Sequence, residues 1–315
     1  MARAFVFPGQ GSQSVGMGRA LHDALPEARA VFAAVDEALG ERLSTVIFEG
    51  PEERLRLTEN AQPALMATSL AALRVLEARS GRLIEDLCAC VAGHSLGEYS
   101  ALAAARALDI GAAARLLRLR GRAMQAAVPV GGGAMAAILG LDLTAVEEVA
   151  SEAGALGVCD VANDNAPAQV VVSGDRAAVE RAVELAKARG ARRSVLLPVS
   201  APFHCRLLRP AADALAEALA TVDLAPPVVP LVSNVRAAPE RDPQALKRLL
   251  VEQVTARVRW RESLLAMAWL GIGEIVELGA GRVLTGLAKR ALPEATAVAL
   301  GNPDEIDAWL AAQSA

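Results

Sequence analysis

The chain has 315 residues, of which 53% are apolar, so it is long enough for a large domain, or a large and a small one, around a sizeable core. A net charge of −4 argues against a nucleic-acid partner, no apolar stretch is long enough to cross a membrane, and no Cys/His cluster has zinc spacing. No signal peptide is visible, and four cysteines without a C-x-x-C pair fit a reducing cytoplasm.

The chain begins with an apolar segment, residues 4–7, that predicts a strand, followed by the glycine-rich turn Pro8-Gly9-Gln10-Gly11-Ser12-Gln13. Such a turn could cradle a phosphate, but it lacks the Walker lysine and the dinucleotide-binding spacing. It could instead donate a backbone N–H to an oxyanion formed at the end of another strand. A simple tight turn is the alternative. Residues 19–80 then predict several helices, the last over 64–79 with Pro63 near its start.

The motif with the clearest chemistry is Gly93-His94-Ser95-Leu96-Gly97, which matches G-x-S-x-G. It lies between an apolar run at 87–92, which predicts a buried strand, and an Ala- and Leu-rich segment at 98–108, which predicts a helix. A strand, a tight turn and a helix are the context of a nucleophile elbow. In that interpretation Ser95 is the nucleophile, and the N–H of Leu96 points at a developing oxyanion. The alternative is a turn in which Ser95 only caps the helix.

Residues 109–124 predict a helix that carries four arginines. Arg115, Arg118 and Arg122 share one face at about 100° per residue, whereas Arg120 falls on the opposite, apolar side. A buried guanidinium needs a partner, because burying it unpaired is costly. That partner is either a carboxylate of the protein or a carboxylate of the substrate, which the planar guanidinium fork would bind through two hydrogen bonds.

A change of pattern predicts a small inserted domain at residues 129–199. The order strand, helix, strand, strand, helix, strand is the ferredoxin-like signature. The predicted strands cover residues 134–141, 158–162, 169–173 and 194–199, and the predicted helices cover residues 144–153 and 177–189. A turn-rich loop, residues 163–167, joins the two central strands. Residues 1–128 and 200–315 are assigned to the large domain.

The last part of the chain returns to the pattern of the large domain. Strands are predicted at 228–232 and 274–278, and helices at 246–253, 260–270, 283–290 and 304–315. Strands that alternate with helices predict a parallel sheet with helices on its faces, and hence an α/β fold.

Three histidines are available as a general base for Ser95, and these are His22, His94 and His204. His22 lies in a polar helical stretch, and the side chain of His94 is expected to leave the turn in another direction from Ser95. His204 follows a loop at the seam between the two predicted domains, where pockets are common. His204 is therefore the preferred base, although a lone histidine is often structural.

Together these stretches resemble the malonyl-CoA:acyl-carrier-protein transacylases of fatty acid synthesis, almost from end to end. The resemblance is carried by a series of motifs in the same order, namely Phe7-Pro8-Gly9-Gln10-Gly11-Ser12-Gln13, Asn60-Ala61-Gln62-Pro63-Ala64, the segment 93–102, Arg120-Gly121, Ala162-Asn163, Phe203-His204-Cys205, Val251-Glu252-Gln253 and Glu277-Leu278-Gly279-Ala280-Gly281. It implies a hydrolase-like parallel-sheet domain with a ferredoxin-like insert, in agreement with the pattern above.

The resemblance also implies roles for individual residues. Ser95 matches the nucleophile that carries a malonyl ester, and His204 matches its base. Gln10 and Leu96 match the two residues whose backbone N–H groups form the oxyanion hole. Arg120 matches the arginine that binds the malonyl carboxylate. No metal or cofactor is implied, and the expected partners are malonyl-CoA and acyl carrier protein.

Other positions follow from the same resemblance. Gln253 matches a glutamine whose backbone carbonyl orients the catalytic imidazole, which makes a Ser–His dyad. Phe203 fits the malonyl-selective members, and Gln62 and Asn163 belong to motifs assigned to the substrate site. Ala168 stands where the family often has glycine.

Several alternatives remain open at this stage. Sequence alone does not exclude Asp109, Asp160 or Asp213 as the acid of a full triad. The same elbow would serve a serine thioesterase or hydrolase, and a transacylase acting in trans in polyketide synthesis would share nearly all these motifs. A non-catalytic carrier-docking module is disfavoured by the presence of Ser95, His204 and Arg120 together.

Overall fold

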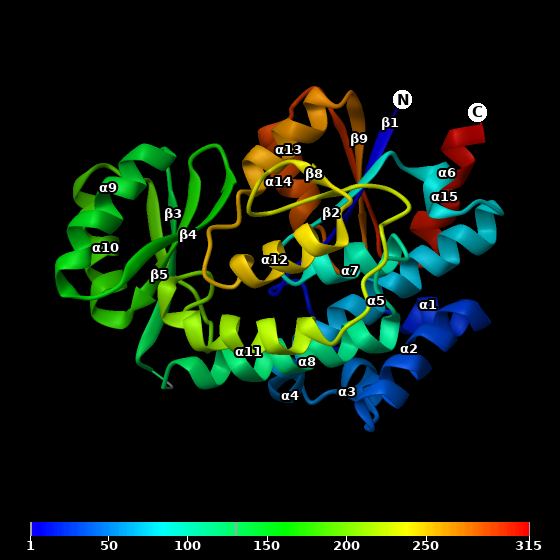
Figure 1. Cartoon of the computed structure of the whole chain (residues 1–315). Coiled ribbons are helices and arrows are strands. Elements are labelled where there is room, and N and C mark those ends of the chain that lie inside the picture. The colour runs from blue at the N-terminus through cyan, green and yellow to red at the C-terminus, as the bar shows by residue number, and fades with distance from the viewer. Residues whose placement is uncertain (1, 130, 315) are drawn as a thin grey trace.

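The computed structural model describes residues 2–129 and 131–314, which form two sheets with helices packed on them (Figure 1). The larger sheet has the strand order β10-β9-β1-β2-β7-β8. Its strands are β1 (Ala2–Phe7), β2 (Cys90–Gly93), β7 (Leu231–Val232), β8 (Pro239–Glu240), β9 (Ile272–Leu278) and β10 (Thr296–Leu300). All neighbours are parallel except β7 and β8. The predicted α/β class is confirmed.

Helices cover both faces of this sheet. Successive side chains of β1 point to opposite faces and are apolar on both, so each face must be shielded from water. Phe5 and Phe7 pack into a core on one face, whereas Ala4 and Val6 pack on the other. The first face is covered by α5 (Thr58–Ser80) and α7 (Gly97–Ala104), and α2 (Pro26–Leu39), α8 (Ile110–Ala127) and α11 (Arg209–Ala220) form a further layer of helices packed outside them. The second is covered by α13 (Trp260–Trp269) and α14 (Val283–Ala291).

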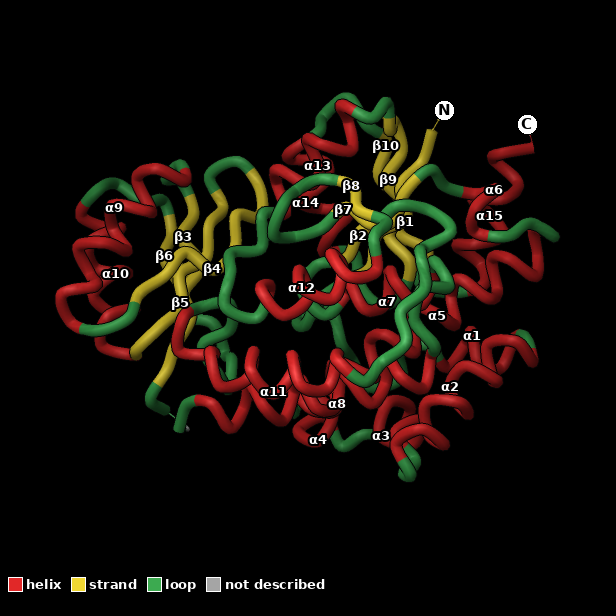
Figure 2. Tube along the Cα trace, viewed as in Figure 1, coloured by secondary structure: helices red, strands yellow, loops and turns green. Residues whose placement is uncertain are grey.

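The remaining helices complete the large part of the molecule (Figure 2). They are α1 (Arg19–Ala24), α3 (Leu43–Glu49), α4 (Glu52–Arg56), α6 (Ile84–Leu87), α12 (Pro243–Gln253) and α15 (Pro303–Ser314). Two 3₁₀ turns, Gly154–Leu156 and Arg206–Leu208, precede β4 and α11.

The smaller sheet has the antiparallel order β4-β5-β3-β6. It consists of β3 (Gly133–Leu139), β4 (Cys159–Ala166), β5 (Gln169–Asp175) and β6 (Arg193–Leu196), with α9 (Leu143–Ala153) and α10 (Arg176–Ala188) packed on one face. The chain order β3-α9-β4-β5-α10-β6 and this strand order confirm the expected ferredoxin-like arrangement, and Figure 1 shows the small sheet beside the large one. The domain boundaries at residues 129 and 199 stay a prediction.

Several predicted elements have other limits in the structure. The strand expected at 87–92 is shorter, because Ile84–Leu87 forms α6 and the strand begins at Cys90. The helix expected from residue 64 begins at Thr58, so Pro63 lies inside α5. The loop expected at 163–167 was wrong, since β4 continues to Ala166. Its polar residues sit at two register shifts in the pairing with β5, which a simple alternation pattern does not reveal.

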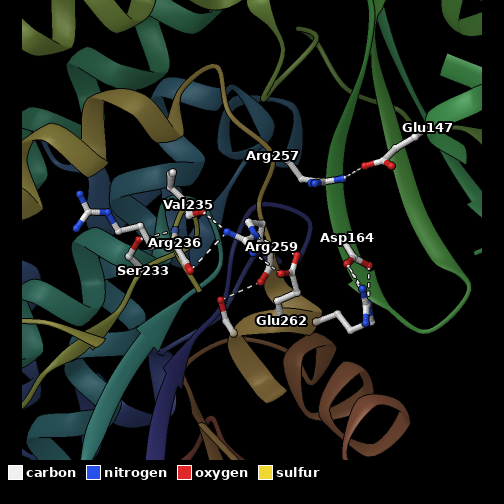
Figure 3. A network of polar contacts seen from close by, with 10 residues as sticks. Glu147, Asp164, Ser233, Val235, Arg236, Arg257, Arg259 and Glu262 are labelled. Carbon is white, nitrogen blue, oxygen red and sulfur yellow. Dashed lines mark hydrogen bonds and ion pairs between the residues drawn. The ribbon is translucent and has the colours of Figure 1, made fainter. Parts of the chain in front are cut away.

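A main-chain bridge joins the small sheet to the segment that precedes α13. Asn163 of β4 pairs with Val258, where the N–H of Asp164 donates to the Val258 carbonyl over 3.0 Å and the N–H of Val258 donates to the Ala162 carbonyl over 2.8 Å. Two ion pairs flank it, Arg261 with Asp164 at 2.8 Å and Arg257 with Glu147 at 2.5 Å (Figure 3). The N–H of Arg259 also donates to the carbonyl of Asn234, just after β7, over 3.0 Å, so the segment before α13 is attached to both parts of the molecule.

The tight turn between β4 and β5 gives a first prediction. Ala168 has φ +54°, a left-handed conformation that costs an L-residue about 1–2 kcal/mol and glycine almost nothing. Ala168→Gly should therefore raise the free energy of unfolding by about 0.5–1 kcal/mol, after allowance for the greater entropy of the unfolded chain. Ala137→Gly, within β3, is the control and should destabilise instead. Urea denaturation midpoints would check both, and a lower midpoint for Ala168→Gly would contradict the argument.

Candidate active site

Ser95 lies in a strained turn between β2 and α7. Its φ is +55°, and the two glycines that flank the turn have no room for a side chain. A Cβ on Gly93 would lie 1.9 Å from the Gly97 carbonyl carbon, and one on Gly97 would lie 2.2 Å from the Phe7 carbonyl oxygen. The backbone of β1 and the turn therefore approach so closely that only glycine fits. The predicted strand, turn and helix of a nucleophile elbow are present.

The hydroxyl of Ser95 contacts His204, from which it is separated by 109 positions in the chain. The distance from Ser95 Oγ to His204 Nε2 is 2.7 Å. On the other side of the ring, Nδ1 lies 2.9 Å from the backbone carbonyl of Gln253. Because a carbonyl only accepts, Nδ1 carries the proton, and Nε2 is left to accept the proton of Ser95. The geometry is that of a hydroxyl next to a correctly oriented base.

None of the three aspartates left open by the sequence lies beside His204. Asp109 caps α8 by accepting from the N–H of Ala112, Asp160 binds Arg206, and Asp213 pairs with Arg209 at 3.1 Å. The Gln253 carbonyl occupies the position that an acid would take in a triad.

Burial and charge keep His204 neutral. Burial and, to a smaller extent, the positive charge of Arg120 together lower the pKa of His204 to about 3, although the hydrogen bond to the Gln253 carbonyl acts in the opposite sense. Since an imidazole must be neutral to accept a proton, the ring is in the form a general base requires at neutral pH.

This shift predicts a pH-dependent difference in stability. In the unfolded chain, His204 is protonated below its ordinary pKa of about 6.5, whereas in the native protein it stays neutral until the pH approaches 3. The unfolded state therefore binds more protons between these two values, and the free energy of unfolding decreases as the pH falls. His204→Gln removes this effect. Relative to wild type, the variant should gain about 2 kcal/mol of stability between pH 7 and pH 5. Urea unfolding of both proteins at the two pH values would measure it; a difference independent of pH would contradict the assignment.

Arg120 is fully buried within α8 and points at Ser95. Its guanidinium donates to Gln62 Oε1 at 2.9 Å, to Gln253 Oε1 at 2.9 Å and to Ser95 Oγ at 3.1 Å. The face of Tyr99 lies 5.8 Å from its central carbon. Among the residues that the structure describes, no carboxylate forms an ion pair with it, and its Nε has no hydrogen-bond partner. A buried cation held only by neutral groups is a site for an anion.

The backbone N–H groups of Gln10 and Leu96 remain available as donors. Within the described chain, neither donates a hydrogen bond to another group, whereas the N–H of Ser95 is taken by Asn234 Oδ1 at 2.8 Å. The Gln10 side chain donates to Thr58 Oγ1 over 3.4 Å. These two N–H groups are where the sequence predicted an oxyanion hole.

A cavity of about 730 Å³ opens in front of Ser95, between the two sheets. Gln62, Asn163 and Phe203 line it, as predicted for substrate-contacting residues. Gln253 does not line it, because this side chain is fully buried behind Arg120 and His204. The volume suits a small-molecule ligand.

The other two histidines lie elsewhere. His94 turns away from Ser95, as expected, and its Nε2 lies 2.8 Å from Asn165 Oδ1 on β4. Its ring also packs against Trp260, with 5.6 Å between centroids. His22 packs against Phe48 at the surface of α1. His204 is thus the histidine that the fold brings to Ser95.

Two buried polar residues behind the site were missed by the sequence analysis. Glu98, in the first turn of α7, accepts from the backbone N–H of Asn234 at 2.6 Å and from Gln253 Nε2. Asn234 in turn donates to the Gly93 carbonyl at 2.7 Å. Burial raises the pKa of Glu98, opposed by these two donors and by the charge of Arg120. An acidic residue in a first helical turn is ordinarily explained by the helix dipole, so the sequence carried no signal of burial.

Comparison with known proteins now decides the family. Residues 4–305 match the model of the acyl transferase domain. The chain belongs to this acyl transferase family. It is 45% identical to the malonyl CoA-acyl carrier protein transacylase of Escherichia coli (strain K12) over 98% of both chains.

Solved structures agree with this assignment of the acyl transferase. The acyl-carrier-protein-S-malonyltransferase of Bartonella henselae superposes with a TM-score of 0.97 at 52% identity, covering 100% of both chains. A malonyl-transacylase in complex with a type II polyketide acyl-carrier protein superposes at 0.95 with 41% identity, over 99% of this chain and 100% of that one. Helices long and apolar enough to span a bilayer do not occur in the described part of this acyl transferase.

Proposed function

We propose that this acyl transferase moves a malonyl group from malonyl-CoA to the phosphopantetheine thiol of acyl carrier protein in fatty acid synthesis, with a malonyl ester on Ser95 as the intermediate. The observation that carries the proposal is the buried Arg120, a cation without an ion-pair partner in the described chain, 3.1 Å from the nucleophile. A short acyl group that ends in a carboxylate would place its carbonyl at Ser95 and its charge on Arg120.

In the first half-reaction His204 Nε2 takes the proton of Ser95 Oγ, which attacks the thioester carbonyl. The resulting tetrahedral oxyanion is bound by the N–H groups of Gln10 and Leu96, each of which contributes a factor of about 10²–10³ in rate. The imidazolium then returns its proton to the sulfur of CoA as the C–S bond breaks. Malonyl-serine and free CoA result.

The second half-reaction runs through the same groups in reverse. CoA leaves, the carrier thiol enters the cavity, and His204 accepts the thiol proton as sulfur attacks the ester. Collapse of the second tetrahedral intermediate breaks the C–O bond to Ser95, which recovers its proton from His204. Ping-pong kinetics follow from this sequence.

Arg120 has a second effect on the base. In the free enzyme its charge depresses the pKa of His204. A malonyl carboxylate bound to the guanidinium would neutralise that charge, so substrate binding makes the imidazole a stronger base at the moment it is needed. The ring of Phe203 lines the cavity, and we propose that it limits the room for a substituent on the malonyl group.

The test uses the unmodified enzyme. Malonyl-CoA alone should produce a covalent malonyl adduct on the peptide that contains Ser95, detected by mass spectrometry, and holo acyl carrier protein should then remove it. Steady release of malonate without carrier would instead indicate a hydrolase. A malonyl-transacylase of similar structure binds a polyketide carrier protein, so the fold alone does not separate fatty acid from polyketide synthesis. Transfer rates measured with both kinds of carrier protein would distinguish the two pathways.

We also propose that the enzyme acts in the cytoplasm. All four cysteines are free and buried, which fits a reducing compartment. Fractionation of the source cells would check this, and recovery from the periplasm or medium would contradict it.

A further inference from the structure

Gln253 lies between two buried side chains, Arg120 and Glu98, and forms a hydrogen bond with each. Its Oε1 accepts from Arg120 at 2.9 Å, and its Nε2 donates to the carboxyl group of Glu98 and to the backbone carbonyl of Ser95 at 2.9 Å. A carboxamide has a donor end and an acceptor end, and both are used here. Rotation of the carboxamide by 180° would place its amino group against the guanidinium, where donor would face donor, and its oxygen against the two groups that now accept from it.

The structure assigns Glu98 as a positioning residue that fixes the orientation of Gln253, so that an oxygen and not an amino group faces Arg120. This assignment rests on the proposed function, because it is the binding of the substrate carboxylate to Arg120 that the orientation serves. Glu98 touches neither Ser95 Oγ nor the cavity, and it acts through Gln253.

The backbone explains why a carboxyl group is needed at position 98. One of its oxygens accepts from the backbone N–H of Asn234, a donor that cannot be turned over. In Glu98→Gln, the amide oxygen must face that N–H, so the new amino group faces the amino group of Gln253. The conflict is relieved only if Gln253 rotates, which presents its amino group to Arg120.

The expected result concerns substrate discrimination. Arg120 then loses the Gln253 oxygen and keeps only that of Gln62 as an amide acceptor, so its guanidinium is positioned less firmly beside Ser95. The KM for malonyl-CoA in Glu98→Gln should rise about 10- to 100-fold, with a smaller change in kcat, and the ratio of malonyl to acetyl transfer should fall by a similar factor. A merely structural role would lower the amount of folded enzyme but leave that ratio unchanged.

Glu77 offers a matched control. It is also a buried glutamate that accepts from one backbone N–H, that of Ile84, and from one side chain, Arg74, but it lies at the far end of α5. Glu77→Gln should reduce thermal stability without altering the ratio of malonyl to acetyl transfer.

A double-mutant cycle keeps the inference testable if Glu98→Gln folds poorly. Gln253→Leu retains the backbone carbonyl that orients His204 but removes the carboxamide, and it should lower the same ratio. Adding Glu98→Gln to it should have no further effect on the ratio, because Glu98 acts only through Gln253. The inference is overturned if folded Glu98→Gln or Gln253→Leu keeps the wild-type ratio, or if the two effects add. Failure of the proposed function would appear separately, as a wild-type enzyme without a malonyl adduct on Ser95.

Discussion

Replacing Ser95 by alanine should abolish the malonyl adduct and reduce transfer to acyl carrier protein by roughly 10⁴- to 10⁶-fold, the loss seen when a nucleophile that acts together with its base is removed. The physical reason is that His204 Nε2, 2.7 Å away, then has no hydroxyl to deprotonate. Stopped reactions with radiolabelled malonyl-CoA would measure both quantities. The proposed oxyanion donors are backbone N–H groups, which this substitution leaves in place. Any transfer rate that remains above the uncatalysed rate would therefore measure what they and substrate binding contribute to catalysis.

Ser100 provides the control for this substitution. It lies in the following helix and is fully buried, and its hydroxyl has no hydrogen-bond partner among the residues that the structure describes. Ser100→Ala therefore removes the same atom from the same region with no expected loss of labelling. Labelling of Ser95→Ala at the wild-type level would exclude Ser95 as the nucleophile.

Replacing Arg120 by alanine should remove the preference for malonyl over acetyl donors. Truncating one partner of a buried, hydrogen-bonded charge pair costs about 2–5 kcal/mol, or about 30- to several-thousand-fold in kcat/KM for malonyl-CoA. Acetyl-CoA has no carboxylate, so its kcat/KM should change far less. Steady-state kinetics with the two donors would give the ratio.

Arg118, on the same helix, separates this effect from the cost of removing a buried arginine. Its guanidinium binds Asn60 at 2.7 Å and pairs with Glu41 and Glu59, away from the cavity. Arg118→Ala should destabilise the protein and preserve donor preference. If Arg120→Ala preserved the preference as well, the carboxylate would have to bind elsewhere.

The parts of the fold that could be predicted from the sequence are those where the local pattern and the tertiary structure favour the same element. The elbow at Ser95 is an example, because an apolar run, two glycines and an Ala-rich segment each favour the element that forms. Strand β10 and the extension of β4 to Ala166 were not predicted. Strand β10 has only five residues, and the end of β4 is a run of polar residues, so neither shows a clear alternation of apolar and polar side chains.

The candidate site divides in the same way. Arg120 stood out because helical phase places it among apolar residues, and the scarcity of histidines pointed to His204. Glu98 and Asn234 could not be found by such arguments. Their importance arises from contacts between segments far apart in the chain, such as that between Asn234 and Glu98, separated by 136 positions. A single sequence gives no measure of such proximity.

The bridge between Asn163 and Val258 bears on how substrates enter. The same stretch of chain begins at Gln253, which orients His204, and reaches Val258, which is bonded to the small sheet. A swinging movement of the small sheet would break two backbone hydrogen bonds and the Arg261–Asp164 pair, and would pull on the residue that aligns the base. We therefore expect the small sheet to keep its position when substrate binds, so that acyl groups are selected by their fit to a preformed cavity and not by closure of the two sheets around them.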